Sequence, residues 1–359
     1  MLPNGCSRRS IAPSSSGELG KWIRRQAQPA AHVHPGRPKV RPTIEDQYDM
    51  TSMTAGLPDV NRPRSPFTLN LKRREAIAAY LFLLPFLAFF AVFTIRAVIN
   101  AVQISFYEYQ ILRPTRPFIG FDNYLELFND DIWWQALGNT VIFTVLTVIG
   151  TSIVALLCAV AVTQPIRGQG FFRVLLYMPS LFSVGAVGLI WVWLLNTQYG
   201  VINYFLSFIG IRPISWLSDP NLVIPSLSLT TIWWTFGFPM LIFIAGLQGI
   251  PEQLYEAARI DGASGRQIFF RITLPLLRPT ILFVTVTGVI AHFQVYGQPL
   301  IMTNGGPGRS SYSVIFYLYQ IAWTAFRMGY GAAIAVVLAL IIATATAVQF
   351  FFIGRRVEY

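Results

Sequence analysis

Six long apolar segments constrain this chain more than any other feature of its sequence. They cover approximately residues 76–98, 139–162, 172–195, 222–247, 280–302 and 329–353. Each is near or above the ~20 residues that a helix needs to cross about 30 Å of hydrocarbon. Because a chain in lipid has to satisfy its own backbone hydrogen bonds, six transmembrane helices are the most economical fold. The predicted class is an all-α polytopic membrane protein.

The composition agrees with this class. The 359 residues are 54% hydrophobic and 12% charged, whereas soluble domains carry about 25% charged residues. The formal net charge of +11 does not form one basic face, since the charges lie in the N-terminal tail and in short patches between apolar segments. That distribution suits membrane topology and not a nucleic-acid partner.

The first 66 residues differ from the rest of the chain. They are rich in Pro, Ser and Arg and show no apolar period, which predicts a disordered N-terminal tail over 1–66. No apolar segment follows Arg8 and Arg9 closely enough for a cleavable signal peptide. The membrane domain is predicted over 75–356.

The flanking Lys and Arg residues predict the orientation. With the N-terminus in the cytoplasm, that side receives Lys72, Arg73, Arg74, Arg167, Arg173, Arg259, Arg266, Arg271, Arg278, Arg355 and Arg356. The opposite side receives Arg96, Arg113, Arg116, Arg212, Arg309 and Arg327. Eleven basic residues on the first side against six on the other favour cytoplasmic positions for both termini.

One cytoplasmic loop, residues 248–279, has the pattern of a short exposed helix. Pro251 suits the first helical turn, Glu252 is favourable beside the helix N-terminus, and Gly262 suits a turn that ends the helix. A second amphipathic piece runs over 268–274 and ends at Pro275. A short helix between two spans has the shape needed to dock in a groove of a soluble partner.

The same loop resembles a known family signature. Glu256-Ala257-Ala258, Gly262 and Ile272-Thr273-Leu274-Pro275 are spaced without a gap as in the EAA loop of binding-protein-dependent ABC importer permeases. The resemblance implies that the loop is a coupling helix seated in a cleft of an ATPase subunit. It implies a coupling set of Glu256, Ala257, Ala258, Gly262, Ile272, Leu274 and Pro275. In that set Glu256 would contact or orient against the ATPase, and Gly262 would form the bend.

Three further stretches resemble the carbohydrate branch of that family, the maltose- and glycerol-phosphate-type first permease. They are residues 120–124 with Trp134, Asn139 and Thr140, the turn 303–308, and the loop entry 246–251. The resemblance covers about 75–356 and implies a sugar permease with a type I importer fold in the bacterial cytoplasmic (inner) membrane. Its implied partners are a second permease, two copies of an ATP-binding subunit, an extracytoplasmic solute-binding protein and a sugar or sugar-like solute.

Polar side chains inside apolar spans are candidates for a solute path. Gln294 and Gln298 share one face of the predicted fifth helix with Thr287, and their amides could bond sugar hydroxyls. Tyr296 could stack on a sugar, and Trp233 lies near mid-span. Hydrogen bonds between helices explain the glutamines equally well, and core packing explains Trp233. The sequence leaves these alternatives open.

A stripe of small residues, Ala335, Ala339, Ala343 and Ala347, follows one face of the last predicted span. Such a stripe lets a second helix approach closely. The neighbouring helix could belong to this subunit or to another one, and the sequence does not decide between them.

Other classes of protein fit the sequence less well. The predicted spans contain no Asp or Glu, and the chain has neither a His-Glu-x-x-His nor a Gly-x-Ser-x-Gly motif. We therefore expect no catalytic residue, metal or cofactor, and no ion-coupled transport through midplane carboxylates. The chain lacks a phosphate-binding loop, so ATP would bind to another chain. A purely structural membrane scaffold remains, opposed only by the EAA resemblance.

Overall fold

The computed structural model describes residues 67–165 and 167–354, and within these ranges it is helical, with two isolated backbone bridges. The predicted tail, 1–66, lies outside the described residues. The chain divides into two compact units inside α2 (Phe67–Phe90), one ending at Ile77 and the other beginning at Ala78. The packing described below lies within the second unit.

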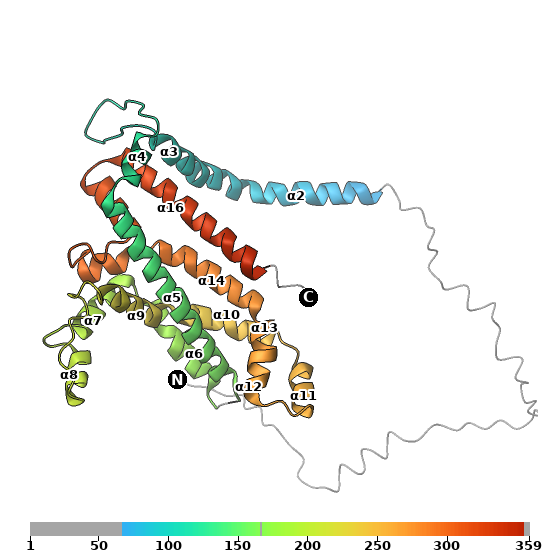
Figure 1. Cartoon of the computed structure of the whole chain (residues 1–359). Coiled ribbons are helices and arrows are strands. Elements are labelled where there is room, and N and C mark those ends of the chain that lie inside the picture. The colour runs from blue at the N-terminus through green and yellow to red at the C-terminus, as the bar shows by residue number, and fades with distance from the viewer. Residues whose placement is uncertain (1–66, 166, 355–359) are drawn as a thin grey trace, which may run out of the picture. The chain divides into compact units, whose positions relative to one another are not determined.

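The described helices follow α2 in this order (Figure 1). They are η2 (Ala91–Ile95), α3 (Arg96–Ile104), α4 (Asp122–Phe128), α5 (Asp131–Thr163), α6 (Gln169–Tyr177), η3 (Met178–Leu181), α7 (Val184–Leu194), α8 (Val201–Phe208), α9 (Val223–Thr235), α10 (Gly237–Gln248), α11 (Glu252–Ile260), α12 (Gly265–Ile268), η4 (Phe269–Thr273), α13 (Leu274–Leu276), α14 (Arg278–Phe293), η5 (Pro299–Thr303), α15 (Val314–Tyr319), η6 (Gln320–Thr324), α16 (Met328–Gln349) and η7 (Phe350–Gly354).

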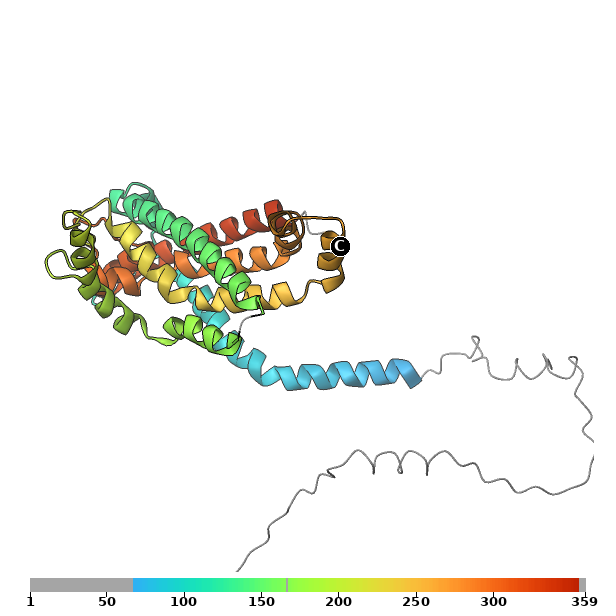
Figure 2. The same cartoon turned by 90° about the horizontal axis from the view of Figure 1, so that it is seen from below.

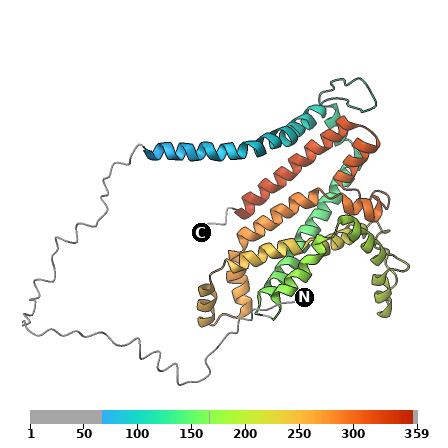
Figure 3. The same cartoon turned by 180° about the vertical axis from the view of Figure 1, so that it is seen from behind.

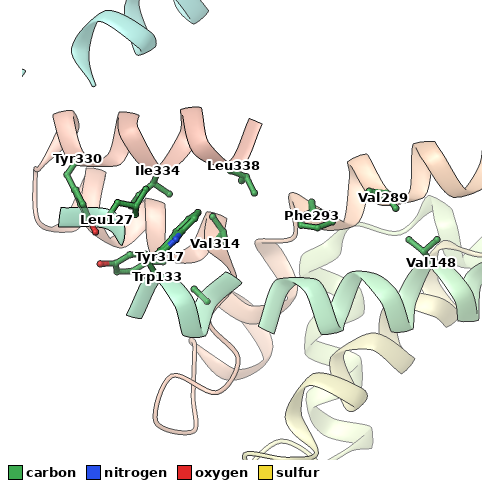
Figure 4. Packing of buried hydrophobic residues seen from close by; sticks show 11 residues of the cluster. Leu127, Trp133, Val148, Val289, Phe293, Val314, Tyr317, Tyr330, Ile334 and Leu338 are labelled. Carbon is green, nitrogen blue, oxygen red and sulfur yellow. The ribbon is translucent and has the colours of Figure 1, made fainter. Parts of the chain in front are cut away.

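Helix α5 is central because it contributes side chains to all three buried apolar clusters. Near its start Trp133 packs with α15 and α16 (Figure 4). Phe143 joins the cluster of α7 and α9, and Ala155 and Ala159 join that of α10 and α14. The two alanines are fully buried, and small side chains of this kind let membrane helices approach closely. The fold therefore depends on one long helix whose neighbours change along its length.

The predicted apolar segments correspond to helices, but not all of them are straight. Three helical stretches, Arg73–Ile104, Asp131–Thr163 and Met328–Phe352, are long and apolar enough to cross a membrane. Three helix pairs are bent, by 93° before α7, by 52° between α9 and α10, and by 63° before α14. The described residues thus hold three candidate spans, or up to six if each bent pair is one span.

The fifth predicted segment, 280–302, is not one continuous helix. Helix α14 ends at Phe293, and Gln294 leaves the helical conformation with φ −96° and ψ 20°. The chain becomes helical again before Pro299, which lies in the first turn of η5, where a missing N–H is tolerated. The expectation that Thr287, Gln294 and Gln298 share one helical face was therefore wrong.

Three of the four alanines in the stripe of α16 point away from the other described helices, and Ala335 is half-buried. Ala339, Ala343 and Ala347 are exposed, whereas Ile334 and Leu338 are buried against α5 and α15. Within the described residues the stripe therefore does not serve packing in this subunit. Residues of the first candidate span are likewise unburied.

Candidate functional site

The loop between α10 and α14 forms two short helices. Pro251 precedes α11 with extended backbone (ψ 131°), Glu252 occupies the first turn and Arg259 the last. These charges complement the partial charges at the two helix ends. After the helix Gly262 has φ +75°, a left-handed conformation that favours glycine, and Ala263 N–H donates to Ala258 O at 2.9 Å. The sequence expectation for this turn is met.

The second limb begins with a capping box, in which Ser264 and Gln267 bond each other's backbone at the start of α12. It continues through η4 and α13 and ends at Leu276, one residue beyond the predicted end at Pro275. The hydroxyls of Tyr255 and Thr273 lie 3.2 Å apart and join the two limbs. A cavity of about 770 Å³ separates the loop from the end of α5.

The predicted coupling residues divide into an exposed and a packed group. Glu256 and Ala257 are exposed, whereas Ala258 on the same helix is buried. Among the described residues Glu256 makes no ion pair or side-chain hydrogen bond. Ile272, Leu274 and Pro275 are half-buried in the second limb. The loop therefore presents one face of α11 outward, with an unpaired carboxylate on it.

The position of this loop is the same in three views. In Figures 1, 2 and 3 helices α11 and α12 lie together at one end of the molecule, beyond the ends of α10 and α14. Arg259, Arg266 and Arg271 are exposed on these two limbs. An exposed helix with this placement can contact a soluble partner without that partner entering the apolar region.

The opposite ends of the helices hold the family-like turn at 303–308. Asn304 and Gly305 both have positive φ, 47° and 81°, and Ser311 Oγ donates to Gly306 O at 2.7 Å. Asn139 on α5 donates to the carbonyl oxygens of Arg309 and Tyr312 at 3.2 and 3.1 Å. The stretch around Asn139 and this turn, distant in sequence, are thus brought together.

A polar network ties α4, α5, α15 and α16 at the same end. Asp130 accepts hydrogen bonds from Tyr317 and, at 2.7 Å, from Tyr330. Burial alone would raise the pKa of Asp130, but the bonds from the two tyrosines and from backbone N–H groups outweigh it and hold the pKa below its usual value. Glu126 and Arg327 form a bidentate ion pair at 2.6 and 2.8 Å.

A cavity of about 360 Å³ lies between α5, η3, the α9–α10 pair and α14. Its polar lining consists of Thr151, Ser152, Ser180, Thr235, Thr287, Trp234 and His292. The remaining lining residues are apolar side chains and Gly288. The cavity is therefore an apolar space with hydroxyl groups from several helices, away from both loop regions.

The four predicted solute-path residues do not line this cavity. Gln298 is buried and donates to Thr231 Oγ1 at 3.2 Å, whereas Gln294 is exposed and bonds Ile290 O in its own helix. Tyr296 packs beside Tyr319, and Trp233 packs edge-on against Trp191. The interhelical bond of Gln298 agrees with the structural alternative for that residue.

Sequence reasoning missed most of the hydroxyl groups in the cavity. Ser and Thr occur throughout the apolar segments, and their positions relative to a cavity depend on how the bent pairs pack. One signal was present on α14, because Val284, Thr287, Gly288, Ala291 and His292 have the spacing of one helical face.

Comparison with known proteins supports one family. The profile of the "binding-protein-dependent transport system inner membrane component" matches residues 151–358. The sulfoquinovosyl glycerol transport system permease protein of Agrobacterium fabrum is 36% identical over 76% of this chain and 89% of its own length. The trehalose/maltose transport system permease protein of Thermococcus litoralis is 32% identical over 80% and 97%.

A solved structure has the same fold. A chain of a bacterial ABC transporter involved in the import of the acidic polysaccharide alginate matches with a TM-score of 0.68 at 24% identity. The match covers 81% of this chain and all of that one. Because the family consists of transport-system membrane components, it excludes the intramembrane enzyme weighed above. The chain belongs to the family of binding-protein-dependent transport system inner membrane components.

Proposed function

We propose that this chain is the membrane-spanning permease of an ATP-driven importer for a sugar or a sugar-like solute. The observation that carries the proposal is α11, an exposed helix bearing Glu256 and ended by Gly262, placed beyond the ends of the membrane helices. The family and the names of two sugar-transport relatives support it. The permease domain is residues 75–356, with the coupling loop at 248–279.

The partners follow from this function. Two copies of an ATP-binding subunit dock on the coupling loops of this chain and of a second permease, since the sequence has no phosphate-binding loop. An extracytoplasmic solute-binding protein delivers the sugar, as the family description requires a binding protein. ATP binding moves α11 and shifts the permease pair between inward-facing and outward-facing states.

Both termini lie in the cytoplasm in this proposal. The count of flanking Lys and Arg residues supports this orientation. So does the contact between η7, at the C-terminal end of α16, and α14, which begins directly after the coupling loop. The membrane is the cytoplasmic (inner) membrane of a bacterium.

The solute passes along the cavity between α5, α9–α10 and α14. Its support is the lining of Ser and Thr hydroxyls inside an otherwise apolar region. Gln294, Tyr296 and Trp233 remain proposals for the outer part of this route, since His292, two residues before Gln294, lines the cavity, whereas for Gln298 the bond to Thr231 supports the interhelical alternative.

Purification of the tagged chain from its native membrane in mild detergent tests the proposal. We expect an ATP-binding subunit, a second permease and a solute-binding protein to co-elute, and the reconstituted complex to accumulate sugar only with ATP. If the purified chain is stable and no ATPase co-elutes with it, a structural membrane scaffold becomes the better explanation.

Substitution of Glu256 tests the coupling role. Glu256→Lys reverses the charge of an exposed carboxylate that has no partner in the described chain. Any loss of uptake must therefore come from a contact outside the described chain. We expect ATP hydrolysis to continue while uptake falls at least about tenfold, the equivalent of 1.4 kcal/mol. Gln253→Lys adds a positive charge to the exposed surface of the same helix and is the control. Normal uptake by Glu256→Lys would refute the role.

A further inference from the structure

The hydroxyl groups around the α5–α14 cavity are arranged mainly as acceptors. Thr235 Oγ1 donates to Thr231 O and Thr287 Oγ1 to Phe283 O, both at 2.7 Å. Ser180 Oγ donates to Trp234 O at 3.0 Å. A hydroxyl has one proton to donate and two lone pairs that accept. With their protons engaged by backbone carbonyls, these three oxygens offer the cavity lone pairs only.

The one indole donor of the cavity is also engaged. Trp234 Nε1 donates to Phe182 O at 3.1 Å, so it is not available to a ligand. His292 packs its ring edge-on against Phe143 and is the only titratable side chain among the described lining residues. No Lys or Arg is among these lining residues. An anion in the cavity would therefore find no Lys or Arg partner among the described lining residues.

Two hydroxyls on α5 lack a partner in the described chain. Thr151 is 4% exposed and its Oγ1 makes no hydrogen bond, and half-buried Ser152 beside it makes none either. A buried polar group without a partner is destabilising. Both residues line the cavity, and the hydroxyl of half-buried Ser152 is the one that a ligand with hydroxyl groups could bond.

We infer that this cavity favours an uncharged, polyhydroxylated solute, a neutral sugar or polyol, over a sugar that carries a phosphate, sulfonate or carboxylate group. This inference rests on the proposed function and specifies its solute. A sugar hydroxyl donates to the lone pairs of Thr235, Thr287 and Ser180, whereas an anionic group cannot donate to these three oxygens and finds an unengaged hydroxyl only at Ser152. Moving an anion into a largely apolar cavity without a cation is also costly. The names of the relatives do not decide the charge of the solute.

Uptake by the complete importer tests this inference. The importer, with its ATP-binding subunits, second permease and solute-binding protein, is reconstituted in liposomes. It is supplied in turn with labelled trehalose, maltose and glycerol as neutral probes, and with sn-glycerol 3-phosphate and alginate trisaccharide as anionic probes. We expect ATP-driven uptake of at least one neutral probe, and none of the anionic probes.

A matched pair of variants tests the cavity itself. Thr287→Val keeps the side-chain shape but removes the acceptor, and Thr287 is exposed in this chain, so the fold should persist. We expect the KM for the neutral probe to rise about fivefold, with ATP hydrolysis retained. Thr344→Val removes a hydroxyl that bonds its helix in the same way outside the cavity, and we expect an unchanged KM.

The outcomes separate the two proposals. ATP-driven uptake of anionic probes alone, or an unchanged KM in Thr287→Val, would overturn the inference and leave the importer function standing. ATP hydrolysis without uptake of any probe, by an importer whose solute-binding protein binds one of them, would overturn the importer function and the inference with it.

Discussion

The hydroxyl of Tyr255 on α11 lies 3.2 Å from that of Thr273 on η4, and this single side-chain bond joins the two limbs of the coupling loop. Thr273 is buried, whereas Tyr255 is half-buried and lines the cavity of about 770 Å³ beside the end of α5. Because a cavity separates the loop from α5, few other contacts hold α11 against the membrane helices. The bond is therefore well placed to transmit a movement of α11 to α14.

Removing this bond should loosen the coupling between ATP hydrolysis and transport. Tyr255→Phe deletes one hydroxyl and keeps the ring, at a cost of about 0.5–1.5 kcal/mol. We expect the ratio of solute transported to ATP hydrolysed to fall about two- to tenfold. Tyr204→Phe on exposed α8 is the control. An unchanged ratio in Tyr255→Phe would show that the bond does not carry the movement.

Gly262 should tolerate no side chain, although space is available for one. A Cβ atom at this position would meet nothing within 4 Å, but the backbone φ is +75°. The left-handed conformation costs a residue with a Cβ about 1–2 kcal/mol, so Gly262→Ala should weaken binding of the ATP-binding subunit about five- to thirtyfold. Gly265, which is equally unobstructed and lacks a positive φ, supplies the control Gly265→Ala. Equal affinities of the two variants, measured by titration, would contradict this.

The network at Asp130 should make its end of the molecule sensitive to acid. Its pKa is lowered in the folded chain by the bonds from Tyr317, Tyr330 and the backbone, which outweigh burial. A lowered pKa contributes stability above the unfolded value of about 4. That contribution is lost as the pH falls through the folded value.

Asp130→Asn keeps the helix cap but removes the charge. We expect it to lower the free energy of unfolding at pH 7 by about 1 kcal/mol, since the group is partly exposed and solvent weakens the interaction. The difference between Asn and wild type should shrink below about pH 4, because wild-type Asp130 is then becoming protonated. Thermal unfolding of the purified complex at several pH values measures this, and a difference that does not depend on pH would contradict the assignment.

The sequence predicted the apolar helical segments and the turn after the short helix in 248–279, because both depend on local properties. Membrane helices are specified by apolar length, and the turn at Gly262 by a residue that tolerates positive φ. Gln294 shows the limit of this approach. Hydropathy continues through 280–302, and it does not register that α14 ends at Phe293 and that the backbone leaves the helical conformation at Gln294.

The candidate solute cavity was the harder target. Its lining comes from α5, η3, the α9–α10 pair and α14, and two of these lie at sharp bends. Which of two residues adjacent in sequence faces the cavity depends on how those bends orient the helices. Trp234 lines it and Trp233 packs against Trp191, although the two are equivalent in hydropathy and position. Tertiary packing determines which of the two tryptophans faces the cavity, and no local feature of the sequence indicates it.

Gln298 allows the two explanations for an amide inside a membrane helix to be separated. It is 7% exposed and donates to Thr231 Oγ1 at 3.2 Å, and Thr231 also donates to Leu227 O at 2.8 Å. Gln298→Leu should therefore remove one interhelical bond without leaving Thr231 unsatisfied. We expect a loss of about 0.5–1.5 kcal/mol in the free energy of unfolding and an unchanged KM for the solute.

Exposed Gln294, whose amide bonds Ile290 O at 3.0 Å in its own helix, provides the comparison. Gln294→Leu should leave thermal unfolding unchanged and raise the KM if this amide contacts the solute. Both quantities can be measured on the same reconstituted preparations. A raised KM in Gln298→Leu without a loss of stability would assign that residue to the solute path, because an interhelical bond alone would affect stability first.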